Sequence, residues 1–260
     1  MAHPLDGCFA LVARAMAHQQ SFDADLFAVA SDPHVGPTFD ARVHHKQRAV
    51  AVVCTNDFHF PPRLGVIFGE AMHDLRCALD NLVFELSTRD GATPDDESRF
   101  PIVIHANEWF TDDVRRSLNH VRPMDRARIE SFQPFMPRGF EAPERHVLAQ
   151  INRYSDEGRR RVLTPIAGAV GSSIVDALEI FDAEIASSAP FVEQPLRKEA
   201  VIAEFGLRVT GLKPTVSVNG EIEWYAALPD RIEARASTWL RDAIAHVNDL
   251  LLDFRHSSFG

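Results

Sequence analysis

The sequence predicts an α+β protein in which a helical bundle forms the core and small antiparallel β elements flank it. Long segments repeat apolar residues every three or four positions, short segments alternate apolar with polar residues, and turn residues separate the two kinds. The 260 residues are 45% hydrophobic, which is enough for one sizeable core, so we expect a single domain, 1–260. The helical core is expected over about 1–160 and 229–256, and the β-containing part over about 162–228.

The first third of the chain is expected to place one hairpin between two long helices. Apolar spacing predicts a helix over 4–30. Residues 39–43 alternate in polarity and residues 49–54 are rich in β-branched side chains, so both segments are expected to be strands of one hairpin. A second helix is predicted over 63–87. The polar residues 88–100 that follow predict a loop.

Shorter helices are expected in the middle of the chain. Residues 100–104 read as an extended segment, and Thr111 is placed to cap a helix whose first turn holds two aspartates. Proline is tolerated at the first position of a helix, where its missing N–H has no partner to lose. Helices are therefore predicted over 123–133 and 143–157, each opened by a proline.

The last third of the chain contains both helix-like and strand-like spacing of apolar residues. Residues 162–205 contain strand-like and helix-like pieces, and the sequence does not decide between them. Asn219-Gly220 stands between two alternating runs within 215–225, which is a strong hairpin signal. A long amphipathic helix is predicted over about 229–256.

Composition excludes several classes of function. The net charge is −10, which argues against attraction of the whole surface to nucleic acid or anionic membranes. No stretch approaches the ~20 apolar residues that span a bilayer, and no signal peptide is visible. The three cysteines are far apart and form no CxxC pair. We therefore expect a cytoplasmic protein without disulfides, either a monomer or a homodimer.

The predicted helix 63–87 carries the most informative pattern. Its apolar residues fall in one arc that faces a core, namely Met72, Leu75, Leu79, Leu82, Val83 and Leu86. His73, Arg76 and Asp80 share a second arc at spacings i, i+3 and i+7, together with Cys77. A polar stripe mixed with apolar residues needs partners.

Four motifs resemble a family of bacterial proteins without an established activity. In that family the signature GD-x-x-HNLRSALDHL precedes an FPI segment, an LQPY element and N-x-x-DKHR. The corresponding segments here are GEAMHDLRCALDNL (69–82), FPI (100–102), FQPF (132–135) and NRYSDEGR (152–159). The resemblance covers about residues 60–162.

The resemblance is degenerate at three positions. Asn81 replaces the second histidine of the first motif, and Glu157 and Gly158 replace the lysine and histidine of the last. If the family uses those histidines for catalysis or metal binding, this member has lost that role. The matching polar residues are His73, Arg76, Asp80, Asp156 and Arg159.

These five residues define the candidate site. The first hypothesis is that His73, Arg76 and Asp80 pair with Asp156 and Arg159 of a neighbouring helix in a buried network, because arginine and carboxylate form charge-assisted bidentate bonds. The protein would then be a non-catalytic binding or interaction protein. The sequence contains no Gly-x-Ser-x-Gly, Walker loop or Gly-x-Gly-x-x-Gly after a strand, so no cofactor is expected.

A ribonuclease of the HEPN type is the alternative. Such domains use an arginine followed four to six residues later by a histidine, which acts on the phosphate. Arg76 meets Asn81 at that spacing, whereas Arg241 with His246 and Arg115 with His120 fit it. Matches of this kind also arise by chance in a chain rich in arginine and histidine, so nucleic-acid binding stays an open alternative.

A metal site is the remaining alternative. Glu70-x-x-His73 has the spacing found in ferritin-like carboxylate sites. Those sites need a second such pair, and the nearest substitute is Asp253-x-x-His256 near the end of the last helix. No metal is therefore expected.

Overall fold

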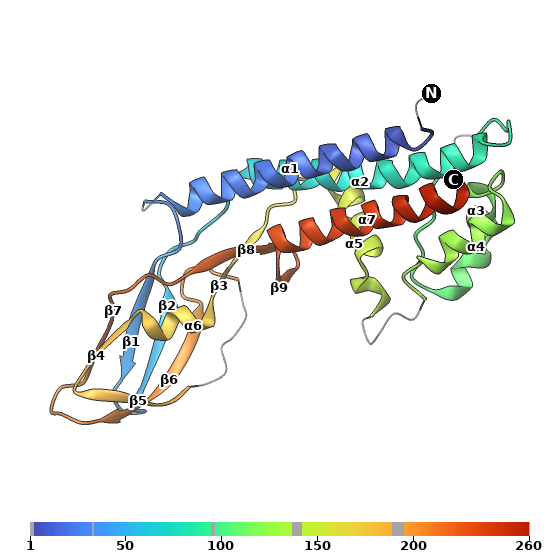
Figure 1. Ribbon diagram of the computed structural model, residues 1–260. Coiled ribbons are helices and arrows are strands. Elements are labelled where there is room, and N and C mark those ends of the chain that lie inside the picture. The colour runs from blue at the N-terminus through green and yellow to red at the C-terminus, as the bar shows by residue number, and fades with distance from the viewer. Residues whose placement is uncertain (1–2, 33, 95–96, 137–141, 189–194, 260) are drawn as a thin grey trace. The chain divides into compact units, whose positions relative to one another are not determined.

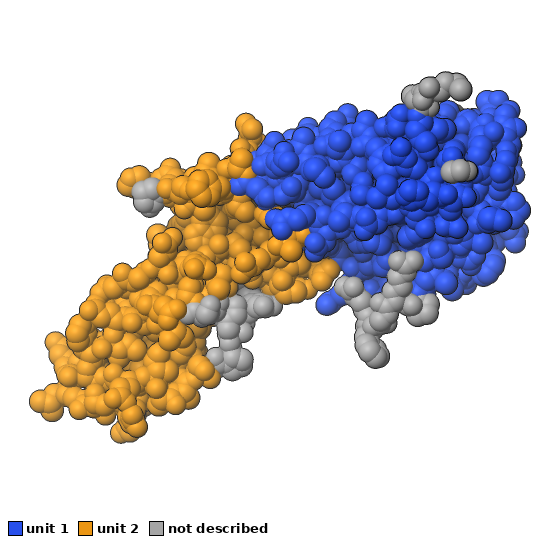
Figure 2. Space-filling view, in the orientation of Figure 1, with its two compact units in different colours: residues 1–23, 65–163, 239–260 blue, residues 24–64, 164–238 orange. Residues whose placement is uncertain are grey.

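The computed structural model describes residues 3–32, 34–94, 97–136, 142–188 and 195–259, with the side chains of residues 171 and 172 left out. Parts of the predicted segments 88–100 and 162–205 lie outside these ranges. The α+β class is confirmed. The chain divides into two compact units (Figure 2): the helical unit, residues 1–23, 65–163 and 239–260, and the β unit, residues 24–64 and 164–238. The expectation of a single domain stays a prediction.

Three long helices supply most of the helical unit (Figure 1): α1 (Asp6–Ala30), α2 (Pro62–Thr88) and α7 (Ala236–Ser258). Three shorter helices belong to it as well: α3 (Asp112–Ser117), α4 (Pro123–Ser131) and α5 (Val147–Gly158). Two 3-10 turns, Ala106–Phe110 and Pro143–Arg145, precede α3 and α5. Among the described residues, none of these helices has a stretch long and apolar enough to cross a membrane.

The core of the helical unit is centred on Phe68 of α2, which is fully buried. Its ring centroid lies 6.4 Å from Phe22 of α1, 5.4 Å from Tyr154 of α5 and 6.1 Å from Trp239 of α7. The predicted apolar arc of α2 is confirmed, because all six of its residues are fully buried: Met72, Leu75, Leu79, Leu82, Val83 and Leu86. Four helices therefore share one core.

Glycines on α2 allow the chain at the end of α5 to approach closely. A Cβ atom added to Gly65 would lie 2.6 Å from Cγ1 of Val162 and 2.9 Å from the carbonyl carbon of Leu163. One turn further along, the Cα of Gly158 is the nearest atom to a Cβ built on Gly69, at 3.9 Å. Position 65 therefore requires glycine, whereas position 69 has room for a methyl group.

We expect Gly65→Ala to lower the free energy of unfolding by about 1–3 kcal/mol, because the backbone of Leu163 must move to admit the methyl group. Gly69→Ala is the matched control on the same helix. It should leave stability unchanged or raise it by up to about 1 kcal/mol, because alanine is the better helix former. Urea unfolding of the two variants measures both effects. Equal destabilisation by both would show that the close approach at Gly65 is not rigid.

The β unit contains three antiparallel sheets within the described residues. The first has the strand order β1-β2-β6-β5, the second β3-β8-β9, and the third pairs β4 with β7. The strands are β1 (Phe39–His44), β2 (Ala49–Cys54), β3 (Ile166–Ala169), β4 (Leu178–Phe181), β5 (Ala183–Ser188), β6 (Val201–Val209), β7 (Thr215–Val218), β8 (Trp224–Leu228) and β9 (Arg231–Arg235). A short helix, α6 (Gly171–Asp176), lies between β3 and β4. The predicted hairpin of residues 39–54 is present as β1 and β2.

The hairpin predicted at Asn219-Gly220 is wrong. β7 pairs with β4, while β8 pairs with β3 and β9. The turn residues bind elsewhere, because the amides of Asn219 and Gly220 both donate to the carbonyl oxygen of Ala177 at 3.0 and 3.1 Å. A Cβ on Gly220 would lie 2.7 Å from the Cα of Ala177, so the glycine serves this close approach.

Two predicted helix starts are also wrong. Residues 231–235 form β9 and pair with β8, so Pro229-Asp230 makes the turn of a hairpin and α7 begins only at Ala236. Pro143 opens a 3-10 turn instead of α5. His146 caps α5, since its Nδ1 accepts a hydrogen bond from the amide of Leu148 at 3.3 Å.

Cys8 of α1 is buried, and this burial, with a smaller contribution from Glu85, raises the pKa of its thiol to about 12. In the unfolded chain the thiol ionises near its ordinary value of 9.0. Since the unfolded chain releases its proton first, the stability that this burial contributes is fully present below pH 9 and falls between pH 9 and 12.

We expect the free energy of unfolding to be about 1 kcal/mol lower at pH 10 than at pH 8. Urea unfolding at pH 8 and 10 measures this loss, and Cys8→Ala should lose less stability between the two pH values than the wild-type protein does. Parallel losses in the two proteins would contradict this prediction.

Candidate functional site

Arg76 and Asp80 are one turn apart on α2 and form an ion pair. The guanidinium Nη2 of Arg76 donates to Oδ1 of Asp80 at 2.9 Å, and Nε donates to Oδ2 at 3.2 Å. This bidentate geometry fixes the orientation of the guanidinium plane. The ion pair therefore forms within α2, whereas the sequence predicted pairing of both residues with α5.

The same two side chains hold the segment at Phe100. Nη2 of Arg76 donates to the carbonyl oxygen of Phe100 at 2.7 Å, and the amide of Phe100 donates to Oδ1 of Asp80 at 2.9 Å. The Phe100 side chain is fully buried. The ion pair thus satisfies both backbone groups of a residue that has no regular strand partner.

Gln133 holds the other end of this segment. Its fully buried amide donates from Nε2 to the carbonyl oxygen of Pro101 at 2.9 Å, and its Oε1 accepts from the amide of Val103 at 3.0 Å. Residues 100–103 are therefore clamped between α2 and the end of α4. This contact gives a physical reason for the FPI and FQPF motifs to occur together.

One nitrogen of the Arg76 guanidinium makes no hydrogen bond to the described residues. The Arg76 residue is 8% exposed, and its Nη1 has no hydrogen-bond partner among the described residues. Arg76 lines a pocket of about 700 Å³, which we call the Arg76 pocket. Its other polar walls include Asp80, Glu108, Thr111, Asn152, Asp156 and Arg159. A buried donor without a partner costs about 1–3 kcal/mol, so a ligand atom that accepts from it is favoured.

The predicted burial of the whole five-residue network is wrong. The side chains of Asp156 and Arg159 on and just beyond α5 are each 58% exposed, and their charged atoms are 3.9 Å apart. No hydrogen bond or ion pair joins them to Arg76 or Asp80 in the described part of the chain. They line the Arg76 pocket instead.

His73 is exposed and lies on a neighbouring surface. Its Nε2 is 3.4 Å from the Sγ of Cys77. Partial burial, followed by the carboxylates of Asp80 and Asp74, raises the pKa of the Cys77 thiol. The thiol is therefore mostly protonated at neutral pH and is a weak nucleophile.

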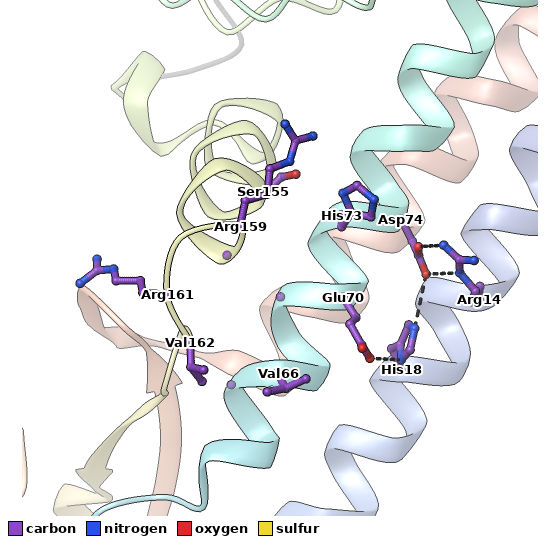
Figure 3. A pocket seen from close by; sticks show the side chains of 13 residues that line it. Arg14, His18, Val66, Glu70, His73, Asp74, Ser155, Arg159, Arg161 and Val162 are labelled. Atoms are coloured by element: carbon purple, nitrogen blue, oxygen red, sulfur yellow. Dashed lines mark hydrogen bonds and ion pairs between the residues drawn. The ribbon is translucent and has the colours of Figure 1, made fainter.

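A second polar cluster joins α1 to α2 (Figure 3). Asp74 is 1% exposed and accepts from Nε of Arg14 at 2.7 Å. His18 lies between the two acids of α2, with Nε2 3.4 Å from Asp74 and Nδ1 3.5 Å from Glu70. Glu70 thus faces His18 of α1, and the i, i+3 spacing to His73 does not build a metal site. Among the described residues no group of three His, Cys, Asp or Glu side chains could hold a metal ion.

The arginine–histidine pairs of the nuclease alternative fall elsewhere in the helical unit. The ring of His246 packs edge-on against His146, with centroids 5.5 Å apart, while Arg241 is exposed. Arg115 pairs with Asp112 at 3.2 Å on the exposed side of α3. Neither pair lines the Arg76 pocket.

The sequence did not reveal Gln133, Asn152 or the backbone of Phe100 as parts of the site. Their signal in the sequence was membership of the motifs FQPF, NRYSDEGR and FPI, because a backbone group or an amide carries no charge pattern. Comparisons of the chain with protein-family models, curated proteins and solved structures found no match.

Proposed function

We propose that this protein is a non-catalytic binding protein and that its ligand is a small carboxylate held in the Arg76 pocket. The observation that carries the proposal is the free Nη1 edge of a guanidinium that is nine-tenths buried and already oriented by Asp80 and Phe100. A preoriented donor loses little entropy when a ligand binds. The half-buried Asn152 and the guanidinium of Arg159 supply further donors at the pocket wall.

The charge of the walls favours a carboxylate over a phosphate. Four acids line this pocket, Asp80, Glu108, Asp113 and Asp156, against the three arginines Arg76, Arg99 and Arg159. A doubly charged phosphate is repelled by these acids more strongly than a singly charged carboxylate. The raised pKa of Cys77, which follows Arg76 on α2, argues against the use of this thiol as a nucleophile.

A titration with butyrate, phosphate and n-butylamine tests the proposal. We expect butyrate to bind with a Kd of about 1 mM, as suits so small an anion, and phosphate and butylamine to bind more weakly. Asn152→Ala should weaken butyrate binding about five-fold and Arg76→Lys at least about ten-fold. Arg89→Lys is the matched control, because the Arg89 side chain is only 15% exposed, pairs with Asp125 and lines neither the Arg76 pocket nor the pocket in Figure 3. Unchanged butyrate affinity in both pocket variants would refute the proposal.

The HEPN-like ribonuclease stays an alternative prediction. It requires an arginine and a histidine that reach one phosphate together. Incubation of the protein with single-stranded RNA, followed by gel analysis, tests it directly. Cleavage that Arg241→Ala or Arg115→Ala abolishes would replace the binding role with a nuclease role.

We further propose that the protein works in a bacterial cytoplasm as a monomer or homodimer and belongs to the motif family described above. Support comes from its three free cysteines, two of them buried, which suit a reducing compartment. The clamped FPI segment also supports the family proposal, because it links three of the four motifs by direct contacts.

A further inference from the structure

A second pocket lies beside the Arg76 pocket in the helical unit. It measures about 730 Å³ and is lined by residues from α1, α2 and α5 and from the segment that follows α5 (Figure 3). Arg159 lines both pockets. Along α2, His73 of this pocket comes one turn before Arg76, so the two pockets follow each other along the same helix. We call it the Ser155 pocket.

The Ser155 pocket contains a buried hydroxyl without a partner. Ser155 is 2% exposed, and its Oγ makes no hydrogen bond within the described residues. A serine in a helix usually donates to the carbonyl oxygen one turn back or faces solvent. Figure 3 shows Ser155 and Arg159 on the side of α5 that faces His73 of α2. The hydroxyl lacks a partner at the wall of this pocket, so a ligand that reaches it between the two helices supplies the missing hydrogen bond.

The charged group of this pocket that is least engaged in ion pairs is an arginine. Its two acids are already paired, Asp74 with Arg14 and His18, and Glu70 with His18. Arg161 pairs with Glu157 at 2.5 Å. Arg159, whose nearest acid is 3.9 Å away, is left to face a ligand, and His73 lines the same pocket. The half-exposed side chains of Val66 and Val162 add apolar surface.

We infer that the two pockets are subsites for one ligand, a linear dicarboxylate. This inference rests on the proposed function, because one carboxylate binds Nη1 of Arg76. The second carboxylate accepts from the hydroxyl of Ser155 and faces His73, and Arg159 lies between the two ends. The middle of the ligand lies along α2 between His73 and Arg76.

The test compares dicarboxylates with monocarboxylates of matched length. Succinate, glutarate, adipate and pimelate are titrated against the wild-type protein beside butyrate, valerate, hexanoate and heptanoate. We expect at least one dicarboxylate to bind about ten-fold more tightly than its monocarboxylate match, which is the gain from one further charge-assisted hydrogen bond. Ser155→Ala should remove that gain and leave the affinity for the monocarboxylates unchanged.

Ser87→Ala is the control variant. Ser87 is a second buried serine of the helical unit, 1% exposed, whose Oγ also has no partner among the described residues and which lines neither pocket. Ser87→Ala should change neither the affinity for the dicarboxylates nor the affinity for the monocarboxylates. If butyrate binds but no dicarboxylate exceeds its match, or if Ser155→Ala weakens both series equally, the two-subsite inference fails and the proposed function stands. If neither series binds, both fail.

Discussion

Replacing Asp125 with alanine is expected to lower the free energy of unfolding by about 3–5 kcal/mol, because it leaves the guanidinium of Arg89 without its carboxylate partner. The side chains of Asp125 and Arg89 are only 6% and 15% exposed, and Nη2 of Arg89 donates to Oδ2 of Asp125 at 2.5 Å. The hydroxyl of Ser258 donates to the other carboxylate oxygen at 2.6 Å, and Nη1 of Arg89 donates to the carbonyl oxygen of Ser258 at 2.7 Å. These bonds join the ends of α2 and α7 to α4.

Asp253→Ala is the matched control for this prediction. Asp253 also joins α4 to α7, through Arg128 at 2.7 Å, but the two side chains are 41% and 31% exposed. Solvent screens such a pair, so we expect a loss of only about 0–1 kcal/mol. Urea unfolding of both variants makes the comparison. Losses of equal size would show that burial of the Asp125 cluster does not control its contribution.

Replacing Arg76 with glutamine is expected to lower the free energy of unfolding by about 2–3 kcal/mol and to abolish butyrate binding. The loss is smaller than for Asp125 because the side chain of Asp80 is 32% exposed and water can reach it. The carbonyl oxygen of Phe100 also loses its donor, which frees one end of the clamped segment 100–103.

A double-mutant cycle separates the two roles of Arg76. Unfolding of Arg76→Gln, Asp80→Asn and the double variant gives the coupling energy of the pair, which we expect to be about 1–3 kcal/mol. Asn152→Ala complements the cycle, because Asn152 lines the pocket without a clamping bond to residue 100 and should affect binding alone. A coupling energy near zero would remove Asp80 as the group that orients Arg76.

Local patterns in the sequence were sufficient to predict the long helices. The buried arc of α2 follows from the spacing of Met72, Leu75 and Leu79, and a helix brings such residues to one face whatever surrounds it. The strands that pair across long distances were not predictable in this way. Asn219-Gly220 carries a hairpin signal, yet the side chain of Asn219 binds Glu179 and both amides bind Ala177, which are contacts that no local window contains.

The candidate site shows the same division. The sequence placed Arg76 and Asp80 in one arc of a helix, but their pairing with each other, which follows because residues four apart on a helix are neighbours, was not predicted. The hydrogen bonds between these side chains and Phe100 were not predictable, because they use the backbone N–H and C=O groups that every residue has. Ser155 and the free edge of Arg76 become visible only when the burial of each polar atom and its hydrogen bonds are known together.

The side-chain NMR signals of Arg76 provide the most direct test of the central claim. Butyrate is added to ¹⁵N-labelled protein while the Nε–H and Nη–H signals of Arg76 and Arg89 are followed. We expect the Arg76 signals to shift saturably, because Nη1 gains an acceptor, and the Arg89 signals to stay in place. Butyrate-dependent shifts elsewhere without a change at Arg76, or no saturable shift at all, would contradict the assignment of the Arg76 pocket as the binding site.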